Sequence, residues 1–556
     1  MSEESQGILR SSAVMAAGTV FSRLSGFLRA ALLTAALGQQ LHGDVFNIAN
    51  TIPNMLYILL AGGIFNAVLV PQLVRAMKTD PDGGAAYTNR VVTLAALFLG
   101  LVSVALVALA PWVMQLFLSN DWADLPEQTA SVVAFARYCL PQVFFYGMFV
   151  LLGQILNARG SFGPMMWAPI ANNVVSIAVL VSYLLVYGPA SDLCGGFSSG
   201  QELLLGLGST VGIAVQLLVL IPYLKAAGFT FRPRFDFRDA GLGHTLRLGL
   251  WTVLFVVVNQ IAYTVVVRLA SSGTAQAALD SCGSGGTQGT GYTVYSQSFL
   301  IVMVPHAVVT VSLATAILPR LSSSASDGDL RALAQTLAHT LRTALAVILP
   351  FAGLLAVIAP DVANLIFNHG AGAPNFALYA PTLTLFGFAL VFFTVHYLML
   401  RGFYALERTR TVFFIQCGVA ATNILAAWLL VRGVSPEGTS PALVVAYAAS
   451  YAVGSALSYL VLRRVVGGLG GRGLLRFAVR AVVAVAGATA IAAVVSWLLH
   501  GWLGGSPAWP VATAILLAAG GLGGLAYLLL ARLLRLTEVT EVLDTLGGRL
   551  WRRRTG

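Results

Sequence analysis

Two arginines interrupt an apolar stretch near the N-terminus. Arg23 and Arg29 lie in FSRLSGFLRA, residues 21–30, and the run from about 12 to 38 is otherwise apolar. A charged side chain at mid-bilayer costs roughly 2.5–3.5 kcal/mol. Guanidinium is a rigid fork of donors suited to bidentate phosphate binding. Six helical residues span about 9 Å of rise and about 120° of rotation, so both side chains could reach one diphosphate-sized anion. The alternatives are structural: Arg23 pairs with backbone carbonyls at a helix break, and Arg29 reaches the outer interface or pairs with Asp44.

The acidic residues are placed differently. None of the 21 Asp and Glu residues falls in the middle of a predicted span, and Asp44, Asp361 and Glu407 lie at span ends. A proton-coupled exporter of cations needs a buried carboxylate to hold its substrate and carry the proton. Buried arginines without buried acids instead favour an anion supplied from outside the chain.

Further polar residues accompany the arginines. Asn47, Asn50 and Asn54 recur at three- and four-residue steps, so they share one helix face. They could line a cavity or bond neighbouring helices, and we favour the cavity because this helix follows the one with the arginines. Three further candidates are more isolated in the sequence. Arg137 lies near Pro141, where packing and function are equally plausible, and Arg268 lies at the outer edge of a span. His306 follows Pro305, and we favour a position in the cavity lining for it.

The elements that position these residues are membrane helices. The chain has 556 residues, of which 58% are hydrophobic and 10% charged, with a mean hydropathy of +0.83, whereas soluble domains are about 25% charged. Windows of about 20 apolar residues predict fourteen spans, at about 12–37, 47–75, 90–117, 130–157, 164–187, 202–224, 245–270, 292–320, 338–360, 378–403, 411–432, 441–463, 474–499 and 509–534. The N-terminus lacks the basic region of a signal peptide, so we expect the first span to be retained.

The loops indicate the orientation. Lysine and arginine gather in the loops after the even-numbered spans, and the loops after the odd-numbered spans are nearly free of them. The positive-inside rule then places both termini in the cytoplasm. The net charge of +11 therefore reflects topology, and no nucleic-acid partner is expected. Cys194 and Cys282 fall in outer loops, where they either form a disulfide or remain two unpaired thiols.

An internal repeat divides the spans. AVLVPQL (67–73) ends the second span and TAILPRL (315–321) ends the eighth, and their prolines are 248 residues apart. Further weak matches near that offset indicate a duplicated six-span unit. Six is even, so the pseudo-twofold axis runs along the membrane normal, as in transporters that bind substrate between repeats. The predicted fold is all-α: a polytopic membrane protein with 14 transmembrane helices. It comprises an N-terminal lobe (1–228), a C-terminal lobe (229–465), two extra helices (466–534) and an amphipathic, basic cytoplasmic tail (535–556).

These features carry a family resemblance. VFSRLSGFLRAALLTAALG, GDVFNIANTIPNMLY and VLVPQLVRAM resemble the MurJ (MviN) family of lipid II flippases, in the multidrug/oligosaccharidyl-lipid/polysaccharide exporter superfamily. The resemblance implies that the chain moves undecaprenyl-pyrophosphate-linked disaccharide-pentapeptide across the bacterial plasma membrane by alternating access. It assigns Arg23 and Arg29 to binding of the pyrophosphate. Asp44 matches the acidic residue at the start of span 2 in family members, and Asn54 matches the asparagine of their Pro-Asn pair. The last two spans would form a groove for the lipid tail.

The chain departs from the family pattern in two places. Many members carry another arginine after the Pro-Asn pair and an Asp-Arg pair before the proline of span 8, and neither is present here. Gln297, His306 or Arg268 could compensate. Some members have a sodium site with carboxylates in the second lobe, but no acid lies within predicted spans 7, 11 or 12. The residues thus argue against that site, and we expect no cofactor.

Two alternative functions are a related glycan exporter and a membrane enzyme. A related exporter of another polyprenyl-pyrophosphate glycan would use the same arginines, so these residues do not exclude it. An enzyme would need clustered acids or a nucleophile with its base at the membrane face, and the outer loops hold only scattered acids. We therefore expect a transporter that acts on lipid II as a monomer among membrane lipids, with cell-wall synthesis proteins as possible partners.

Overall fold

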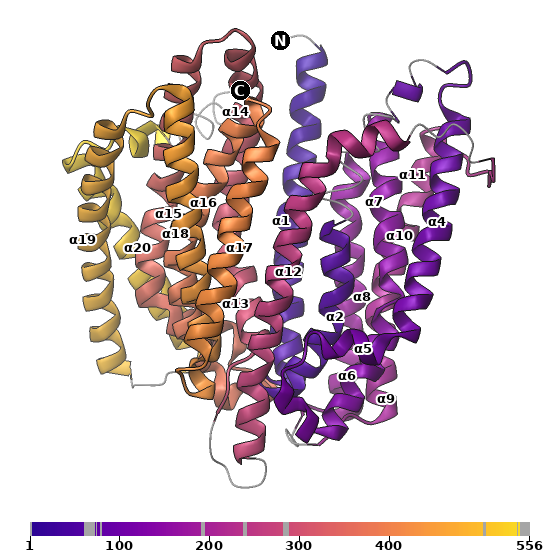
Figure 1. The fold of residues 1–556 in the computed structure, drawn as a ribbon. Coiled ribbons are helices and arrows are strands. Elements are labelled where there is room, and N and C mark those ends of the chain that lie inside the picture. The colour runs from indigo at the N-terminus through magenta and orange to yellow at the C-terminus, as the bar shows by residue number, and fades with distance from the viewer. Residues whose placement is uncertain are drawn as a thin grey trace. The chain divides into compact units, whose positions relative to one another are not determined.

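All regular structure in the described part of the chain is helical. The computed structural model describes residues 3–59, 73, 75–77, 80–190, 195–236, 242–281, 288–503, 508–541 and 543–544. Within these ranges no strand is formed, and long helices dominate (Figure 1). The predicted all-α class is confirmed.

The first half of the chain contains helices of very different lengths. They are α1 (Glu3–Leu37), α2 (Leu41–Leu59), α4 (Ala85–Ala108), α5 (Ala110–Gln115), η2 (Asn120–Asp124), α6 (Pro126–Cys139), α7 (Gln142–Ala158), α8 (Gly163–Tyr187), α9 (Ser199–Glu202), η3 (Leu203–Leu207), α10 (Gly208–Leu218), α11 (Leu220–Ala226) and α12 (Leu242–Ser281).

The second half is built in the same way. Its helices are α13 (Tyr292–Pro305), η4 (His306–Thr310), α14 (Val311–Ser326), α15 (Leu330–Phe367), η5 (Gly370–Leu378), α16 (Tyr379–Ala405), α17 (Thr409–Val431), η6 (Pro436–Gly438), α18 (Thr439–Val466), α19 (Gly471–Leu503) and α20 (Trp509–Leu533).

Twelve helical segments in the described residues are long and apolar enough to cross a membrane. They run from Ala85–Ala108 to Trp509–Leu533 and coincide one for one with predicted spans 3 to 14. Helix α1 covers the first predicted span, and α2 covers the first part of the second, the rest of which falls mostly outside the described ranges. The chain is therefore a multi-pass membrane protein, and the full count of fourteen stays a prediction.

Prolines account for several interruptions within single spans. Helix α6 ends at Cys139 and α7 begins at Gln142, on either side of Pro141. Pro305 ends α13, and the next five residues form a π-helical turn that leads into α14. Proline lacks the N–H that would bond four residues back, so a span bends or changes its helical pitch at these points.

The chain forms two compact units. The first contains Met1–Thr293 and His369–Ala373, and the second contains Val294–Asn368 and Pro374–Gly556. Helix α12 packs against α2 and belongs to the first unit, although the sequence repeat assigns it to the second lobe. Contacts and sequence repeat thus divide the chain at different places, and the predicted lobe boundaries stay a prediction.

Helices α15, α19 and α20 pack on one another within the second unit. Their interface is rich in alanine, a residue type that lets membrane helices approach closely, and includes Ala346, Ala481, Ala484, Ala488 and Ala526. After α20, Leu536 and Val539 join the same buried cluster, and Glu538 pairs with Arg342 of α15 at 3.1 Å. The beginning of the predicted tail thus packs on the helices.

A hydrogen bond between α20 and α15 compensates for a proline. Pro350 provides no N–H, so the carbonyl of Ala346, four residues earlier, loses its helical donor. The buried hydroxyl of Tyr527 donates to this carbonyl at 2.7 Å. A freed carbonyl in a membrane helix needs such a partner.

Replacing Tyr527 by phenylalanine should lower the free energy of unfolding by about 1 kcal/mol, because the Ala346 carbonyl loses its donor. Thermal unfolding of the purified protein would measure this. In the background of Pro350→Ala, which restores the N–H, the same substitution should cost clearly less. Equal costs in both backgrounds would contradict the assignment.

Candidate functional site

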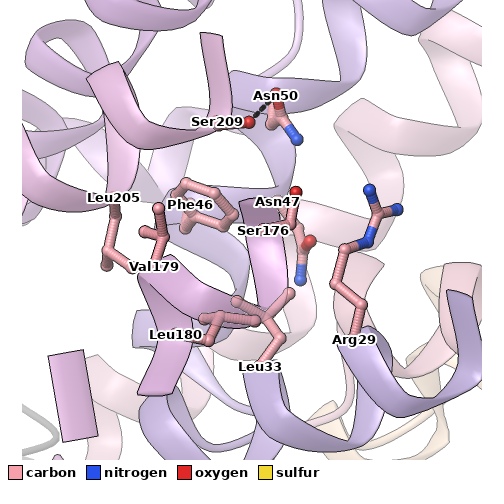
Figure 2. A pocket seen from close by; sticks show the side chains of 10 residues that line it. All are labelled: Arg29, Leu33, Phe46, Asn47, Asn50, Ser176, Val179, Leu180, Leu205 and Ser209. Carbon is pink, nitrogen blue, oxygen red and sulfur yellow. Dashed lines mark hydrogen bonds between the residues drawn. The ribbon is translucent and has the colours of Figure 1, made fainter. Parts of the chain in front are cut away.

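A small cavity opens beside Arg29 in the first unit. Its volume is about 60 Å³, which is room for a few water molecules. Four helical regions contribute the lining, which consists of Arg29 and Leu33 from α1; Phe46, Asn47 and Asn50 from α2; Ser176, Val179 and Leu180 from α8; and Leu205 and Ser209 from η3 and α10 (Figure 2). No acidic side chain is among them.

Arg29 is the only charged residue in this lining. Its partly buried side chain extends from α1 toward Asn47 and Asn50 (Figure 2). Within the described residues it makes no hydrogen bond or ion pair, so neither Asp44 nor any other described carboxylate neutralises it. A guanidinium in a low-polarity environment without a counter-ion attracts an anion.

Two asparagines of α2, Asn47 and Asn50, line the cavity. Asn47 and Asn50 are partly buried, whereas the intervening Ile48 and Ala49 are fully buried. The Asn50 Oδ1 accepts from Gln142 Nε2 at 3.1 Å and from the Ser209 hydroxyl at 3.3 Å. These bonds leave the Asn50 Nδ2 group turned into the cavity (Figure 2).

Asn47 has a second role. Its Nδ2 donates to the Thr293 hydroxyl at 2.9 Å. Asn47 and Asn50 therefore line the cavity and also form hydrogen bonds to neighbouring elements. Asn54, on the same face after Pro53, is exposed and is not part of the lining.

Asn173 of α8 bonds the turn of α1 from Ser22 to Ser25, which contains Arg23 and lies one turn before Arg29. Its Nδ2 donates to the Ser22 carbonyl at 3.0 Å and to the Ser25 hydroxyl at 2.9 Å. Ser25 in turn donates to the Ser22 carbonyl at 3.0 Å. These bonds fix the rotation of α1 about its axis and hence the direction of Arg29.

Changing Asn173 to leucine, which has a similar size but no donor, should lower substrate transport several-fold with the arginines intact. A loosened α1 no longer directs Arg29 into the cavity, and misplacing such a group by about 1 Å can cost on the order of 100-fold. Transport would be measured at matched membrane levels of protein. Asn172→Leu is the neighbouring control, and equal effects of the two changes would argue against a specific role for Asn173.

Asp44 lies outside the cavity and is engaged elsewhere. Its fully buried carboxylate accepts from the Thr274 hydroxyl at 2.7 Å and from the backbone N–H groups of Tyr292 and Thr293 at 3.0 and 2.6 Å. The two N–H groups begin α13, so Asp44 caps a helix distant in sequence. A side chain at Gly291 would overlap this carboxylate. Its assignment to substrate stays a prediction, but the geometry gives it a structural task.

The remaining candidates of the first unit do not line the Arg29 cavity. Arg23 is partly buried on α1. Arg137 is exposed on α6, beside an open hollow of about 500 Å³ that includes Trp122 and Pro126. Arg268 donates to the Gln115 carbonyl, at the end of α5, and to Asn120 Oδ1 at 2.9 Å. Its guanidinium thus terminates a helix.

Two candidates belong to the second unit. Gln297 Oε1 accepts from the Tyr379 hydroxyl at 2.5 Å. His306 is buried in the π-helical turn, with the rings of Phe393 and Tyr397 at centroid distances of 4.7 and 4.8 Å. Gln297 thus bonds a tyrosine, and His306 packs against two aromatic rings. Cys194 and Cys282 lie outside the described residues.

Sequence reasoning missed Gln142, Ser176 and Ser209 in and around the cavity. They come from α7, α8 and α10, and nothing in their spacing relates them to α2. The available signal was a glutamine and two serines inside apolar spans, because such polar side chains need hydrogen-bond partners in a membrane.

The comparison with known families settles where the chain belongs. The model of the family described as lipid II flippase MurJ matches residues 33–513. The chain belongs to the lipid II flippase MurJ family. Two MurJ relatives are each 26% identical to it. The probable lipid II flippase MurJ of Rhizobium meliloti (strain 1021) aligns over 441 residues, 79% of this chain and 78% of that protein. The lipid II flippase MurJ of Burkholderia cenocepacia aligns over 453 residues, 80% and 81% of the two chains.

Solved structures support the MurJ fold. A lipid II flippase MurJ in an inward closed conformation matches with a TM-score of 0.69 and 17% identity, over 94% of this chain and 98% of that one. An inward-facing multidrug resistance MATE transporter of the MOP superfamily matches with a TM-score of 0.62 and 14% identity, over 81% and 95%. MurJ family members are transporters, which agrees with the prediction that the chain is not an enzyme.

Proposed function

We propose that this chain moves lipid II from the inner to the outer leaflet of the bacterial plasma membrane by alternating access. Membership of the lipid II flippase MurJ family supports the substrate and the process. The observation that carries the mechanism is the Arg29 guanidinium, which lies in a cavity without acids and has no partner among the described residues. We assign it to the pyrophosphate of the substrate.

The chemistry of the cavity fits a pyrophosphate. An arginine provides two parallel donors for the oxygens of one phosphate, and charge-assisted bonds of this kind are about twice as strong as neutral ones. The Nδ2 group of Asn50, whose Oδ1 accepts from Gln142 and Ser209, adds a neutral donor nearby. Arg23 lies about two turns away on the same helix and would engage the second phosphate as the cavity widens.

The cavity must open during transport. Its volume of about 60 Å³ is far smaller than a disaccharide-pentapeptide. We assign the lipid tail to α19 and α20, whose outer faces carry exposed aliphatic residues such as Val479, Val482 and Leu525. No bound sodium ion is required in this proposal, because the membrane potential could drive the cycle. Both termini are proposed to be cytoplasmic.

Complementation of a flippase-depleted bacterial host tests the proposal. Wild-type protein and the Arg23→Ala/Arg29→Ala variant would be expressed at matched membrane levels, and the fraction of lipid II in the outer leaflet measured. We expect wild type to restore transport and the variant to fail. If both are equally active, the arginines are structural. If well-inserted wild type fails, a different polyprenyl-pyrophosphate glycan becomes the better substrate assignment, and such glycans would be tested next.

A further inference from the structure

The segment between α11 and α12 runs as a strap, residues 229–236, along the start of α4. It begins at a fixed point: Phe229 is buried in the core of the first unit, under the Arg159 guanidinium at 5.5 Å from the ring centroid. Arg159 also donates to the Ala227 carbonyl at 2.8 Å. The strap therefore leaves α11 in a defined direction.

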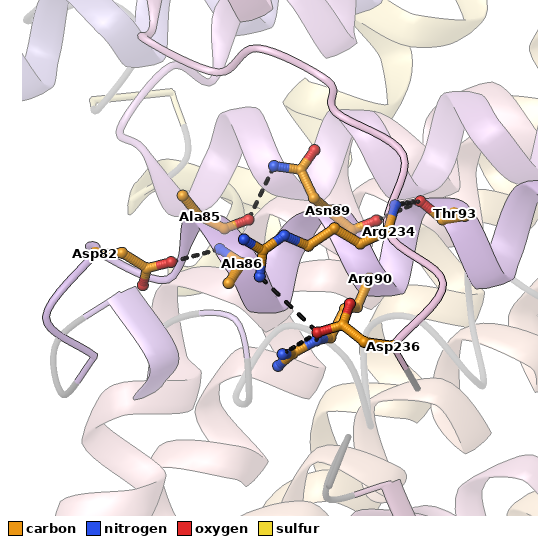
Figure 3. Close-up of polar contacts among 8 residues, drawn as sticks. All are labelled: Asp82, Ala85, Ala86, Asn89, Arg90, Thr93, Arg234 and Asp236. Carbon is orange, nitrogen blue, oxygen red and sulfur yellow. Dashed lines mark hydrogen bonds and ion pairs between the residues drawn. The ribbon is translucent and has the colours of Figure 1, made fainter. Parts of the chain in front are cut away.

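Two backbone hydrogen bonds align the strap with α4. The N–H of Arg232 donates to Asn89 Oδ1 at 2.8 Å. The N–H of Arg234 donates to the Thr93 hydroxyl at 3.1 Å (Figure 3). Asn89 and Thr93 are one helical turn apart, about 6 Å along α4, which matches the reach of two extended residues. Pro233, which has no N–H, occupies the intervening position, where an extended chain directs the N–H away from α4.

An ion pair fixes the end of the strap. Asp236 accepts from Arg90 Nε at 3.0 Å, and Arg234 lies 4.0 Å from the same carboxylate (Figure 3). The hydrogen bond from Arg90 lowers the pKa of Asp236 below its ordinary value. The pair is therefore formed at neutral pH and would be lost only in acid, as the pH falls through that lowered pKa.

The strap exposes aromatic and basic side chains. Phe231 is 49% exposed and Phe235 is 68% exposed. In an extended chain they share one face with Pro233, and Arg232 and Arg234 project from the other. Both arginines are exposed, and two carboxylates in the described residues interact with Arg234: Asp236, at 4.0 Å, and the exposed Asp82.

The face of α4 under the strap continues as a lipid-facing stripe. Leu97, Leu101 and Val104 lie within about 80° of Thr93 around the helix axis and are 52%, 71% and 67% exposed. Exposed aliphatic side chains in a spanning helix contact lipid tails. The strap therefore lies where this stripe ends, at the level of the lipid headgroups, on the side that the positive-inside rule places in the cytoplasm.

We propose that the strap binds the anionic phospholipid headgroups of the cytoplasmic leaflet. Phe231 and Phe235 enter the boundary between headgroups and tails, where aromatic rings favour an interface. Arg232 and Arg234 contact the phosphates, each contributing about a factor of five to local lipid occupancy. The α4–strap unit then anchors the first unit at the membrane surface, whatever glycan-lipid the protein transports.

Photo-crosslinking in vesicles tests this surface. The full chain, with p-azidophenylalanine in place of Phe231 or Phe235, would be reconstituted into phosphatidylcholine vesicles with or without phosphatidylglycerol. Illumination should add one phospholipid to the protein mass, with several-fold more phosphatidylglycerol adduct than its share of the lipid predicts. Arg232→Gln with Arg234→Gln should abolish this enrichment.

Three controls separate the possible outcomes. A probe at Leu101 reports that insertion and lipid labelling are intact, and Arg463→Gln with Arg464→Gln, at the end of α18, removes the same charge elsewhere. Lipid labelling at Leu101 but not at Phe231 or Phe235 would overturn the proposal. Labelling that does not depend on phosphatidylglycerol content or on the strap arginines would overturn headgroup selectivity. A crosslink to a second copy of the protein would assign the surface to protein contact instead.

Discussion

Alanine in place of Arg29 should reduce lipid II transport by about 10- to 100-fold at unchanged protein levels. The guanidinium is the only charge in the cavity lining, and it has no partner among the described residues. A hydrogen bond to a charged group contributes about 1.5–3 kcal/mol, and each 1.4 kcal/mol corresponds to about a factor of ten. Losing this interaction would remove most of the attraction between cavity and pyrophosphate.

Lysine at position 29 should restore part of this loss. It keeps the charge but replaces the planar fork by a point charge. The readout is the fraction of lipid II in the outer leaflet of a flippase-depleted host, with Arg137→Ala as control, because Arg137 is an exposed arginine outside this cavity. Wild-type transport by Arg29→Ala, or an equal loss in Arg137→Ala, would refute the assignment of Arg29.

Alanine in place of Asp44 should destabilise the protein by about 3 kcal/mol. The carboxylate accepts hydrogen bonds from the Thr274 hydroxyl and from the N–H groups of Tyr292 and Thr293, in a fully buried position. Each donor that loses its acceptor in such a place costs about 1–3 kcal/mol, and the costs do not simply add. The start of α13 also loses its cap.

Thermal unfolding in detergent would measure this effect independently of transport. Asp44→Asn, which keeps one acceptor oxygen and nearly the same volume, should lose clearly less stability. Gly291→Ala should act like the alanine variant, because its methyl group would occupy the place of the carboxylate. If Asp44→Ala unfolds like wild type but cannot transport lipid II, the carboxylate acts on substrate and the family assignment from sequence is the better one.

Hydropathy predicted the spans well because each depends on a local run of apolar residues. Twelve predicted spans coincide with helices of suitable length and composition. The three- and four-residue spacing of the α2 asparagines likewise put Asn47 and Asn50 on one helix face, since helical periodicity is a local property. Neither inference needed knowledge of which helices are neighbours.

Sequence reasoning could not predict hydrogen-bond partners that are distant in the chain. Asp44 bonds residues 230 to 249 positions away, and no periodicity reports such a contact. Arg268 was considered for the substrate but bonds Gln115 and Asn120. Asn173 was not among the candidates, although it bonds the α1 turn that contains Arg23.

The hydrogen bond from Tyr527 to Ala346 also bears on biosynthesis. The two residues are 181 positions apart, so at about 5–20 residues per second the ribosome needs on the order of ten seconds or more to add Tyr527 after Ala346. During that interval α15 is in the bilayer with a carbonyl that Pro350 has deprived of its donor, and the carbonyl must bond to water or to another group. The bundle of α15, α19 and α20 is therefore completed only when the last span is inserted. A chain shortened before α20 would leave this defect permanently open in the membrane, a feature that quality-control proteases can detect.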